Sequence, residues 1–293
     1  MKLKKLLALF GMLGTVFVLL SACSNKAENS NRKIKIVTTT NVYANIAQNI
    51  VGKYGSADAI ITNSTTDPHD FEPTTNDAKK VADANIVVAN GLGYDSWMNN
   101  LADSSNKKAV LVGEDLMKLK KGDNPHIWYN LNMPVKYVDY LVERLSKLDK
   151  KHASYFKKNG QEYLAKINKL KAEVKKIDGK HQKPVYVSEP VFDYALEEAD
   201  YRIGDRGFEK AIENGTDPSP QMIDQMTNAI KAKKIAFFVN NIQASSSTVE
   251  NFVKIAKENK IPVISVRETI PNHTSYLGWM KSNYQKLIDV SEK

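Results

Sequence analysis

Four side chains that can bind a metal ion follow short hydrophobic segments of the kind that form buried strands. They are two histidines and two glutamates, at His69, His126, Glu189 and Glu268. In open α/β sheets, ligands bind at the edge formed by the carboxyl ends of the strands. Imidazole and carboxylate groups both coordinate zinc and manganese, and neither requires a sulfur ligand beside it. The pattern therefore predicts one ion held by two imidazoles and two carboxylates in a cleft between two halves of the chain.

Both histidines stand in loops that contain proline. His69 lies in Asp67-Pro68-His69-Asp70-Phe71-Glu72-Pro73, among three carboxylates, and His126 lies in Asn124-Pro125-His126-Ile127-Trp128. Proline fixes its own φ at about −65° and restricts the residue before it, so both loops are expected to be stiff. For each histidine the alternative is a local hydrogen bond within a turn and no ligand.

The two glutamates are expected at strand exits in the second half of the chain. Glu189 precedes Pro190 next to apolar residues, where a buried carboxylate is costly unless a cation or a salt bridge compensates it. Glu268 follows the last predicted strand, and its alternative is a surface charge. His273 and Asp205 are competing candidates for this fourth position.

Hydrophobic strand-like segments alternate with amphipathic helical segments on both sides of one long helix. Apolar residues from Phe156 to Ile177 recur at steps of three, four and seven, which predicts a helix that ends at Gly179. The alternation predicts two α/β lobes with mostly parallel sheets. We expect the first lobe over 34–150, the linking helix over 151–178 and the second lobe over 179–293.

The first residues indicate a processing segment outside the fold. A lysine-rich start precedes an uncharged run over residues 6–20, which is shorter than the roughly 20 apolar residues that span a membrane. Leu20-Ser21-Ala22-Cys23 resembles the lipobox of bacterial lipoproteins. We therefore expect a signal peptide over 1–22, a lipid on Cys23 and a polar tether over 23–33. An ordinary thiol fits poorly, because Cys23 is the single cysteine and ends an apolar leader.

Composition excludes several classes of site. With Cys23 used for lipid, the folded part has no cysteine for disulfides or thiolate metal sites. The chain has 42 Lys and Arg and 33 Asp and Glu, and loss of three leader lysines leaves 39 against 33, a net charge of +6. Many lysines are interleaved with acidic residues along the predicted long helix. This pattern favours a solvated surface over a nucleic-acid interface, which would need a concentrated basic stripe.

The motifs, in their order along the chain, resemble those of the metal-binding lipoproteins of zinc and manganese ABC importers. The resemblance rests on the lipobox, both proline-histidine loops, the long helix and Ser188-Glu189-Pro190-Val191-Phe192-Asp193-Tyr194, and it covers the chain nearly end to end. It implies two lobes, each a mostly parallel four-stranded sheet flanked by helices, joined by one rigid helix with one metal between them.

The resemblance also implies roles for individual residues. His69, His126 and Glu189 match three ligands of the family, and Glu268 stands where the family commonly has an aspartate. The histidine-rich loop of some zinc-binding members is absent from this sequence.

These observations predict a receptor that is anchored by lipid on the extracellular face of the bacterial cell membrane. We expect it to capture zinc or manganese as a monomer and to deliver the ion to an ABC permease and its ATPase, with no catalytic residues and no nucleic-acid partner. The alternatives are a metal-dependent hydrolase and a surface adhesin or receptor for an organic solute. Neither His-Glu-x-x-His nor Gly-x-Ser-x-Gly occurs in the chain, which disfavours the hydrolase.

Overall fold

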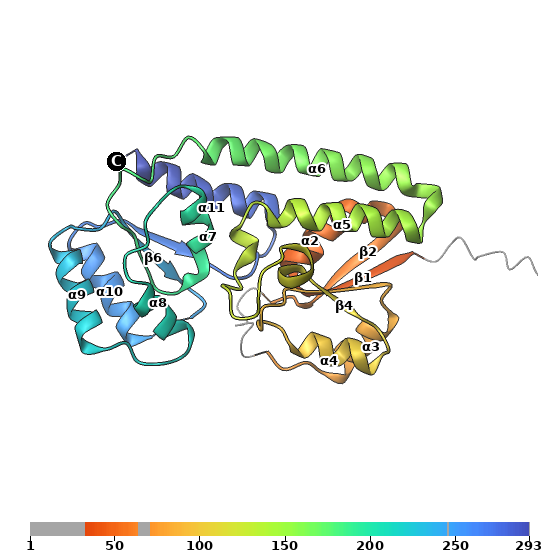
Figure 1. Cartoon of the computed structure of the whole chain (residues 1–293), viewed down its shortest axis with the longest axis horizontal. Coiled ribbons are helices and arrows are strands. Elements are labelled where there is room, and N and C mark those ends of the chain that lie inside the picture. Colours follow the sequence, from red (N-terminus) through yellow and green to blue (C-terminus); the bar gives the residue numbers. More distant parts are fainter. Residues whose placement is uncertain (1–32, 64–70, 245, 293) are drawn as a thin grey trace, which may run out of the picture. The chain divides into compact units, whose positions relative to one another are not determined.

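The computed structural model describes residues 33–63, 71–244 and 246–292 (Figure 1). From Ile34 onward the chain forms one compact unit. Two of the predicted functional residues, His69 and Cys23, lie outside the described ranges, as do the predicted signal peptide and nearly all of the predicted tether.

The first half of the unit contains a four-stranded parallel sheet. Its strands are β1 (Ile34–Thr40), β2 (Gly55–Ile61), β3 (Ile86–Ala89) and β4 (Ala109–Leu111), in the order β2-β1-β3-β4. Ile36 of β1 stands opposite Ala57 of β2 on one side and Ile86 of β3 on the other. All four carboxyl ends therefore meet at one edge, and the strand order reverses between β1 and β3, where α/β sheets bind ligands.

Helices cover both faces of this sheet (Figure 1). They are α2 (Asn41–Val51), α3 (Thr75–Asp83), α4 (Trp97–Ser104) and α5 (Met133–Leu148). Successive residues of a strand point to opposite faces, so Ile86 and Val88 of β3 pack in the core that contains α2 and α5. Val87 packs in the second core, with α3 and α4. Burial on both faces explains why β3 is a continuous apolar segment.

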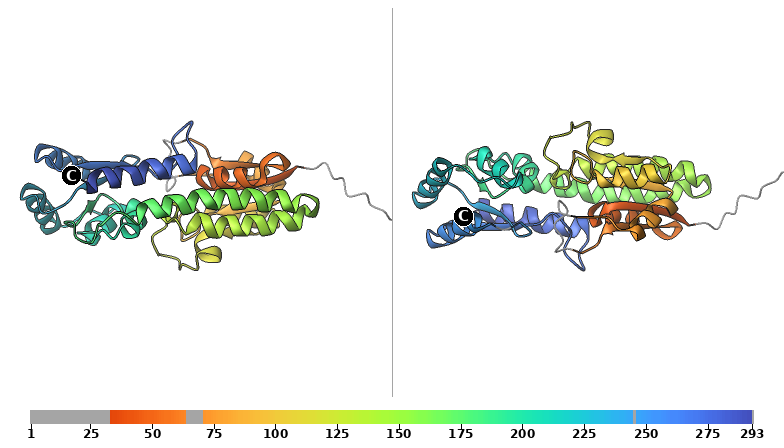
Figure 2. Two further views of the ribbon diagram at one scale, coloured as in Figure 1. Left: turned by 90° about the horizontal axis from the view of Figure 1, so that it is seen from above. Right: turned by 90° about the horizontal axis from the view of Figure 1, so that it is seen from below.

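The long helix predicted between the halves is α6 (Ala153–Val174), which spans 22 residues and ends before Gly179, where the sequence pattern predicts its end. Its buried residues include Phe156, Tyr163, Ile167 and Leu170, all on the stripe that the sequence pattern selected. It packs against α5 and α11 (Tyr276–Ser291), and the view from above in Figure 2 shows these helices side by side. The helix is therefore part of one hydrophobic core that contains residues of both halves.

The second half contains a smaller parallel sheet. Strands β5 (Tyr186–Val187), β6 (Phe238–Asn241) and β7 (Val263–Val266) pair in this order. A single parallel bridge between Val185 and Ile203 extends the sheet beyond β5, where a fourth strand was expected. The remaining helices are α7 (Asp193–Glu198), α8 (Arg206–Glu213), α9 (Pro220–Lys231) and α10 (Ser247–Glu258). Two parallel sheets with flanking helices and a long connecting helix confirm the predicted fold class.

Hydrogen bonds fasten the two halves to each other. The Asn41 side chain exchanges two bonds with the Ile270 backbone, donating to its carbonyl at 3.0 Å and accepting from its N–H at 3.1 Å. The buried Tyr276 hydroxyl donates to the Trp128 carbonyl at 2.7 Å. Breaking such a bond leaves a buried polar group unsatisfied, at a cost of about 1–3 kcal/mol. Large swings of one half against the other are therefore disfavoured.

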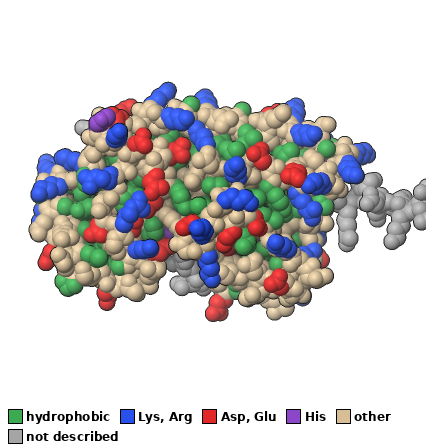
Figure 3. Space-filling model, in the orientation of Figure 1, with side chains coloured by type: hydrophobic (Ala, Val, Ile, Leu, Met, Phe, Trp, Pro, Cys, Tyr) green, Lys and Arg blue, Asp and Glu red, His purple; other side chains and the backbone are tan. Residues whose placement is uncertain are grey.

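The surface carries mixed charge. On the face in Figure 3, Lys and Arg side chains are interspersed with Asp and Glu and do not gather in one stripe. Across the described part of the chain, the helices lack the combined length and apolar character that a membrane span needs.

Gly160 permits the close approach of α6 to α5, because a Cβ there would stand 2.6 Å from Val142 Cγ2. We expect Gly160→Val to lower the free energy of unfolding by about 2 kcal/mol through overpacking. Ala165→Val on the exposed face of the same helix is the control, with an expected change below about 0.7 kcal/mol from helix propensity alone. Urea denaturation measures both variants, and equal losses would contradict a tight contact at Gly160.

Candidate metal centre

His126 is completely buried where the first half meets the second, just before the 3₁₀ turn Ile127–Tyr129. Asn124 Oδ1 lies 2.7 Å from His126 Nδ1 and also accepts the His126 backbone N–H at 2.9 Å. An amide oxygen can only accept, so in the neutral ring Nδ1 carries the proton and Nε2 carries the lone pair. Asn124 thus orients the imidazole and leaves Nε2 as the nitrogen for a metal ion.

Two carboxylates of the second half flank this nitrogen. His126 Nε2 lies 3.8 Å from Glu268 Oε2 and 4.0 Å from Glu213 Oε1. Two donors bound to one ion at about 2.1 Å each stand about 3.0–3.5 Å apart when they are neighbours in its coordination sphere. Both oxygens lie farther from the imidazole nitrogen than this spacing, and each would have to move toward it by less than about 1 Å to share an ion with it.

The two predicted glutamates meet through one amide. Asn241 Nδ2 donates to Glu189 Oε2 at 2.7 Å and to Glu268 Oε1 at 2.9 Å. Glu189 follows β5, Asn241 ends β6 and Glu268 follows β7, so parallel pairing of the three strands brings these side chains to one edge. Their exposure is 8% for Glu189 and 2% for Glu268, which places two carboxylates in a nearly dry environment.

A tyrosine of the first half reaches the same carboxylate. The Tyr94 hydroxyl donates to Glu268 Oε2 at 2.9 Å. Burial, and then the charge of Glu268, raise the pKa of Tyr94, so its hydroxyl remains a neutral donor. Glu268 is therefore fixed by one donor from each half of the molecule.

A cleft of about 750 Å³ lies beside these residues. Residues from both halves line it, among them Tyr94, Asn124, Arg206 and Glu213. Of the carboxylates near His126 Nε2, Glu213 belongs to the cleft lining, and its side chain is 16% exposed.

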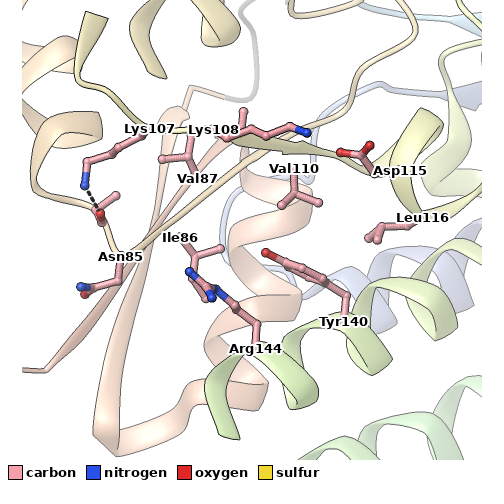
Figure 4. Close-up of a pocket in the computed structure, with 12 residues that line it drawn as sticks. Asn85, Ile86, Val87, Lys107, Lys108, Val110, Asp115, Leu116, Tyr140 and Arg144 are labelled. Atoms are coloured by element: carbon pink, nitrogen blue, oxygen red, sulfur yellow. Dashed lines mark hydrogen bonds between the residues drawn. The ribbon is translucent and has the colours of Figure 1, made fainter. Parts of the chain in front are cut away.

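A second hollow, of about 540 Å³, has a different character (Figure 4). It lies where β3 and β4 begin, at the opposite end of these strands from their ligand-binding edge. Lys107, Lys108 and Arg144 line it together with one carboxylate, Asp115. Three cationic side chains against one carboxylate disfavour a divalent cation there.

A buried pair of carboxyl groups, Asp193 and Glu209, fixes α8, the helix that carries Glu213. Arg206 Nη1 lies 3.2 Å from Asp193 Oδ2 and 3.6 Å from Glu209 Oε1, and both carboxylate side chains are 4% exposed. Burial, and then the charge of Asp193, raise the pKa of Glu209 to about 9. Burial also raises the pKa of Asp193, against the opposing effect of Arg206. At neutral pH the pair therefore keeps a proton between its two carboxyl groups, one helical turn before Glu213.

The competing candidates for the fourth ligand lie in other surroundings. The Asp205 carboxylate caps α8 by accepting the Phe208 N–H at 2.9 Å. His273 is exposed, with φ of 61°. Among these candidates in the described part of the chain, Glu268 is the one placed beside His126 Nε2.

Sequence patterns missed Glu213 and Asn241. Glu213 stands four residues after Glu209 on one short helix, a spacing that puts both on one face, but nothing local relates that face to His126. Within residues 33–63, 71–244 and 246–292, no three His, Cys, Asp or Glu side chains stand close enough to hold an ion. His69 lies outside these ranges.

The shared proton predicts a pH dependence of stability. The Glu209 pKa is raised from 4.5 to about 9 on folding, so between these values the folded state holds a proton that the unfolded state releases. The stabilisation that this proton gives to the folded state is fully present below about pH 4.5 and is lost as the pH rises toward about 9. Glu209→Gln cannot ionise, so we expect its free energy of unfolding, relative to the parent, to rise over this range.

Urea denaturation across the same pH range measures this difference. Glu162→Gln is the control, because the Glu162 side chain is 61% exposed on α6 and its curve should parallel that of the parent. A constant difference between Glu209→Gln and the parent at every pH would contradict a buried proton on the pair.

The chain is similar to known proteins of one family. The model of a family described as the periplasmic zinc-uptake complex component A, ZnuA, matches residues 36–290. The metal ABC transporter substrate-binding lipoprotein ScbA of Streptococcus cristatus is 28% identical, over 94% of this chain and 96% of its own. The manganese ABC transporter substrate-binding lipoprotein PsaA of Streptococcus mitis is 27% identical, over 98% of this chain and 99% of its own.

Solved structures share the fold. The Zn(II)-bound ZnuA-like domain of Streptococcus pneumoniae AdcA has a TM-score of 0.71 at 22% identity, covering 89% of this chain and 100% of that one. The SBP FpvC of Pseudomonas aeruginosa in complex with Ni²⁺ has a TM-score of 0.72 at 21% identity, covering 89% and 97%. The resemblance drawn from the motifs is thereby confirmed. Because the family model spans nearly the whole compact unit, this chain belongs to the family of ZnuA, the periplasmic component A of the zinc-uptake complex.

Proposed function

We propose that this chain is an extracytoplasmic solute-binding lipoprotein that captures a divalent transition metal between its two halves and delivers it to an ABC permease. The observation that carries the proposal is the position of His126 Nε2, which belongs to the first half and faces Glu268 and Glu213 of the second. Relatives named as metal substrate-binding lipoproteins along almost the entire chain favour this function over a hydrolase or an adhesin.

The proposed ligands are His69, His126, Glu189 and Glu268. Two neutral imidazoles and two carboxylates match the charge of a divalent ion, which limits the cost of burying it. A carboxylate has about four acceptor positions, so Glu268 can bind an ion and still accept from Tyr94 and Asn241. The neighbouring carboxylates Glu189 and Glu268 repel each other without a cation, and ion binding relieves this repulsion.

Zinc and manganese both suit this donor set. Imidazole nitrogen is a preferred ligand of zinc, whereas carboxylate oxygen also suits manganese. Elemental analysis of the protein purified without chelator, followed by competition between the two ions, identifies the transported metal.

Capture should involve little movement of the two halves. The Asn41–Ile270 and Tyr276–Trp128 hydrogen bonds cross between them, and α6 packs along a core that they share. We therefore expect the ion to rearrange side chains and loops at the cleft, with only a small swing of the lobes over 34–150 and 179–293 about the helix within 151–178.

The membrane attachment remains part of the proposal. A signal peptide over 1–22 would be removed, and lipid on Cys23 would hold the receptor at the extracellular face of the membrane through the tether over 23–33. The binding unit works as a monomer that meets the permease and its ATPase partner at this surface. Four protein ligands complete a tetrahedral zinc site and leave no position there for a catalytic water, so we propose no enzymatic activity.

His126→Ala tests the site directly. We expect it to remove the rise in melting temperature that zinc or manganese gives the parent, because the buried imidazole is a ligand that no neighbour replaces. At a hundredfold excess of metal over Kd, the parent should gain about 2.7 kcal/mol, and the variant should gain almost none. His69→Ala should behave in the same way.

His181→Ala is the matched control. Its imidazole is exposed and lies 2.6 Å from Asp178, so metal stabilisation should equal that of the parent. Metal stabilisation of His126→Ala as large as that of the parent and of His181→Ala would place the binding site elsewhere.

A further inference from the structure

Glu213 lies beside the candidate site but is not one of the four proposed ligands. Its Oε1 atom is 4.0 Å from His126 Nε2, almost the same distance as that of Glu268 Oε2. The two oxygens differ in access, since the Glu268 side chain is 2% exposed and the Glu213 side chain is 16% exposed. Glu213 also lines the cleft. Of the two carboxylates described beside the imidazole, Glu213 is therefore the one that is also open to the cleft.

The helix that carries Glu213 is fixed through its cap and its first turn. Asp205 caps α8 through the Phe208 N–H, and the Phe208 ring is fully buried in a cluster with α9 and α10. Arg206 and Glu209 attach the helix to Asp193 at the beginning of α7. Glu213 is consequently presented by an anchored backbone, which is the requirement for a preorganised ligand.

The position of Glu213 on α8 also favours a cation. It is the last residue of the helix, where the partial negative charge of the carbonyl ends disfavours a carboxylate and favours positive charge. A divalent ion beside His126 would offset both the carboxylate and the helix end. Glu213 needs to approach His126 by less than about 1 Å to share an ion with it at ordinary bond lengths.

We propose that Glu213 is an additional oxygen ligand on the cleft side of the ion and that it makes the site favour manganese relative to zinc. The inference rests on the proposed function and adds a determinant of selectivity to it. Zinc in protein sites is usually complete with four ligands, so a fifth donor adds little to its binding. Manganese takes more ligands and prefers carboxylate oxygen, so the same donor adds more to its binding.

Glu213→Gln tests the proposal, with Asp217→Asn as the matched control. Both variants remove one negative charge, but Asp217 is an exposed residue four positions beyond Glu213. Metal-free protein is titrated with manganese and with zinc in competition with a chelator of known affinity. We expect Glu213→Gln to weaken manganese binding by about tenfold or more and zinc binding by less than about threefold. Asp217→Asn should change neither affinity.

A spectroscopic measurement separates direct coordination from an effect on folding. Electron paramagnetic resonance of the bound Mn²⁺ in ¹⁷O-labelled water reports coordinated water. Glu213→Ala, which leaves no side-chain oxygen at this position, should bind one more water than the parent, because solvent fills the position that the carboxylate vacates.

Each outcome decides the inference. Unchanged manganese affinity, an equal loss for both ions, or an unchanged number of bound waters would overturn it. Any of these results, together with loss of binding in His126→Ala, would leave the proposed function standing. Undiminished binding in His126→Ala would instead remove the proposed function itself.

Discussion

Two buried carboxylates that share one amide are the constraint on which the site depends. Asn241 Nδ2 donates to both Glu189 and Glu268, and these like charges are held together in a place with little water. Such an arrangement is costly unless positive charge compensates it. The Asn241 amide and the Tyr94 hydroxyl donate to these carboxylates, and in the proposed function a divalent ion adds positive charge beside them. The proposed metal site thus coincides with the place where the fold brings two buried carboxylates together.

The fold places these charges by a simple topological rule. Parallel strands end at a common edge, so residues far apart in sequence converge once β5, β6 and β7 pair. The first half contributes His126, whose ring is oriented by Asn124. Asn124 Nδ2 in turn donates to the Pro190 carbonyl at 2.7 Å, next to Glu189. The same asparagine therefore sets the tautomer of the imidazole and joins it to the opposite half.

The rigidity between the halves comes mainly from apolar packing, whereas the candidate site depends on buried charges and hydrogen bonds. The shared core around α6, with the buried tyrosines Tyr276 and Tyr284 donating to backbone carbonyls of the first half, leaves little freedom for a hinge. The cleft wall that includes α8 is instead fixed by Arg206 and by a proton held between Asp193 and Glu209. Apolar burial is insensitive to pH, whereas the attachment of α8 weakens when that proton is lost.

The sequence by itself indicated most of the elements and all four of the proposed metal ligands. Apolar periodicity located β3 and the buried stripe of α6, because burial on one or both faces requires such patterns. Residue type at strand exits selected His126, Glu189 and Glu268 as proposed ligands, and the parallel topology explains why the two glutamates lie close together near His126. The expected fourth strand of the second sheet, however, is a single bridge at Val185, a boundary that local propensity does not encode.

Only the tertiary structure decided which polar groups orient the proposed metal ligands and which could add a further ligand. Glu213 and Asn241 have no distinguishing neighbours in sequence, and they matter because α8 and β6 bring them to His126 and Glu268. The choice of Glu268 over Asp205 as the neighbour of His126 was likewise spatial, since Asp205 is used as a helix cap. Local patterns reflect burial and backbone preference, whereas contacts between distant segments depend on how whole elements pack.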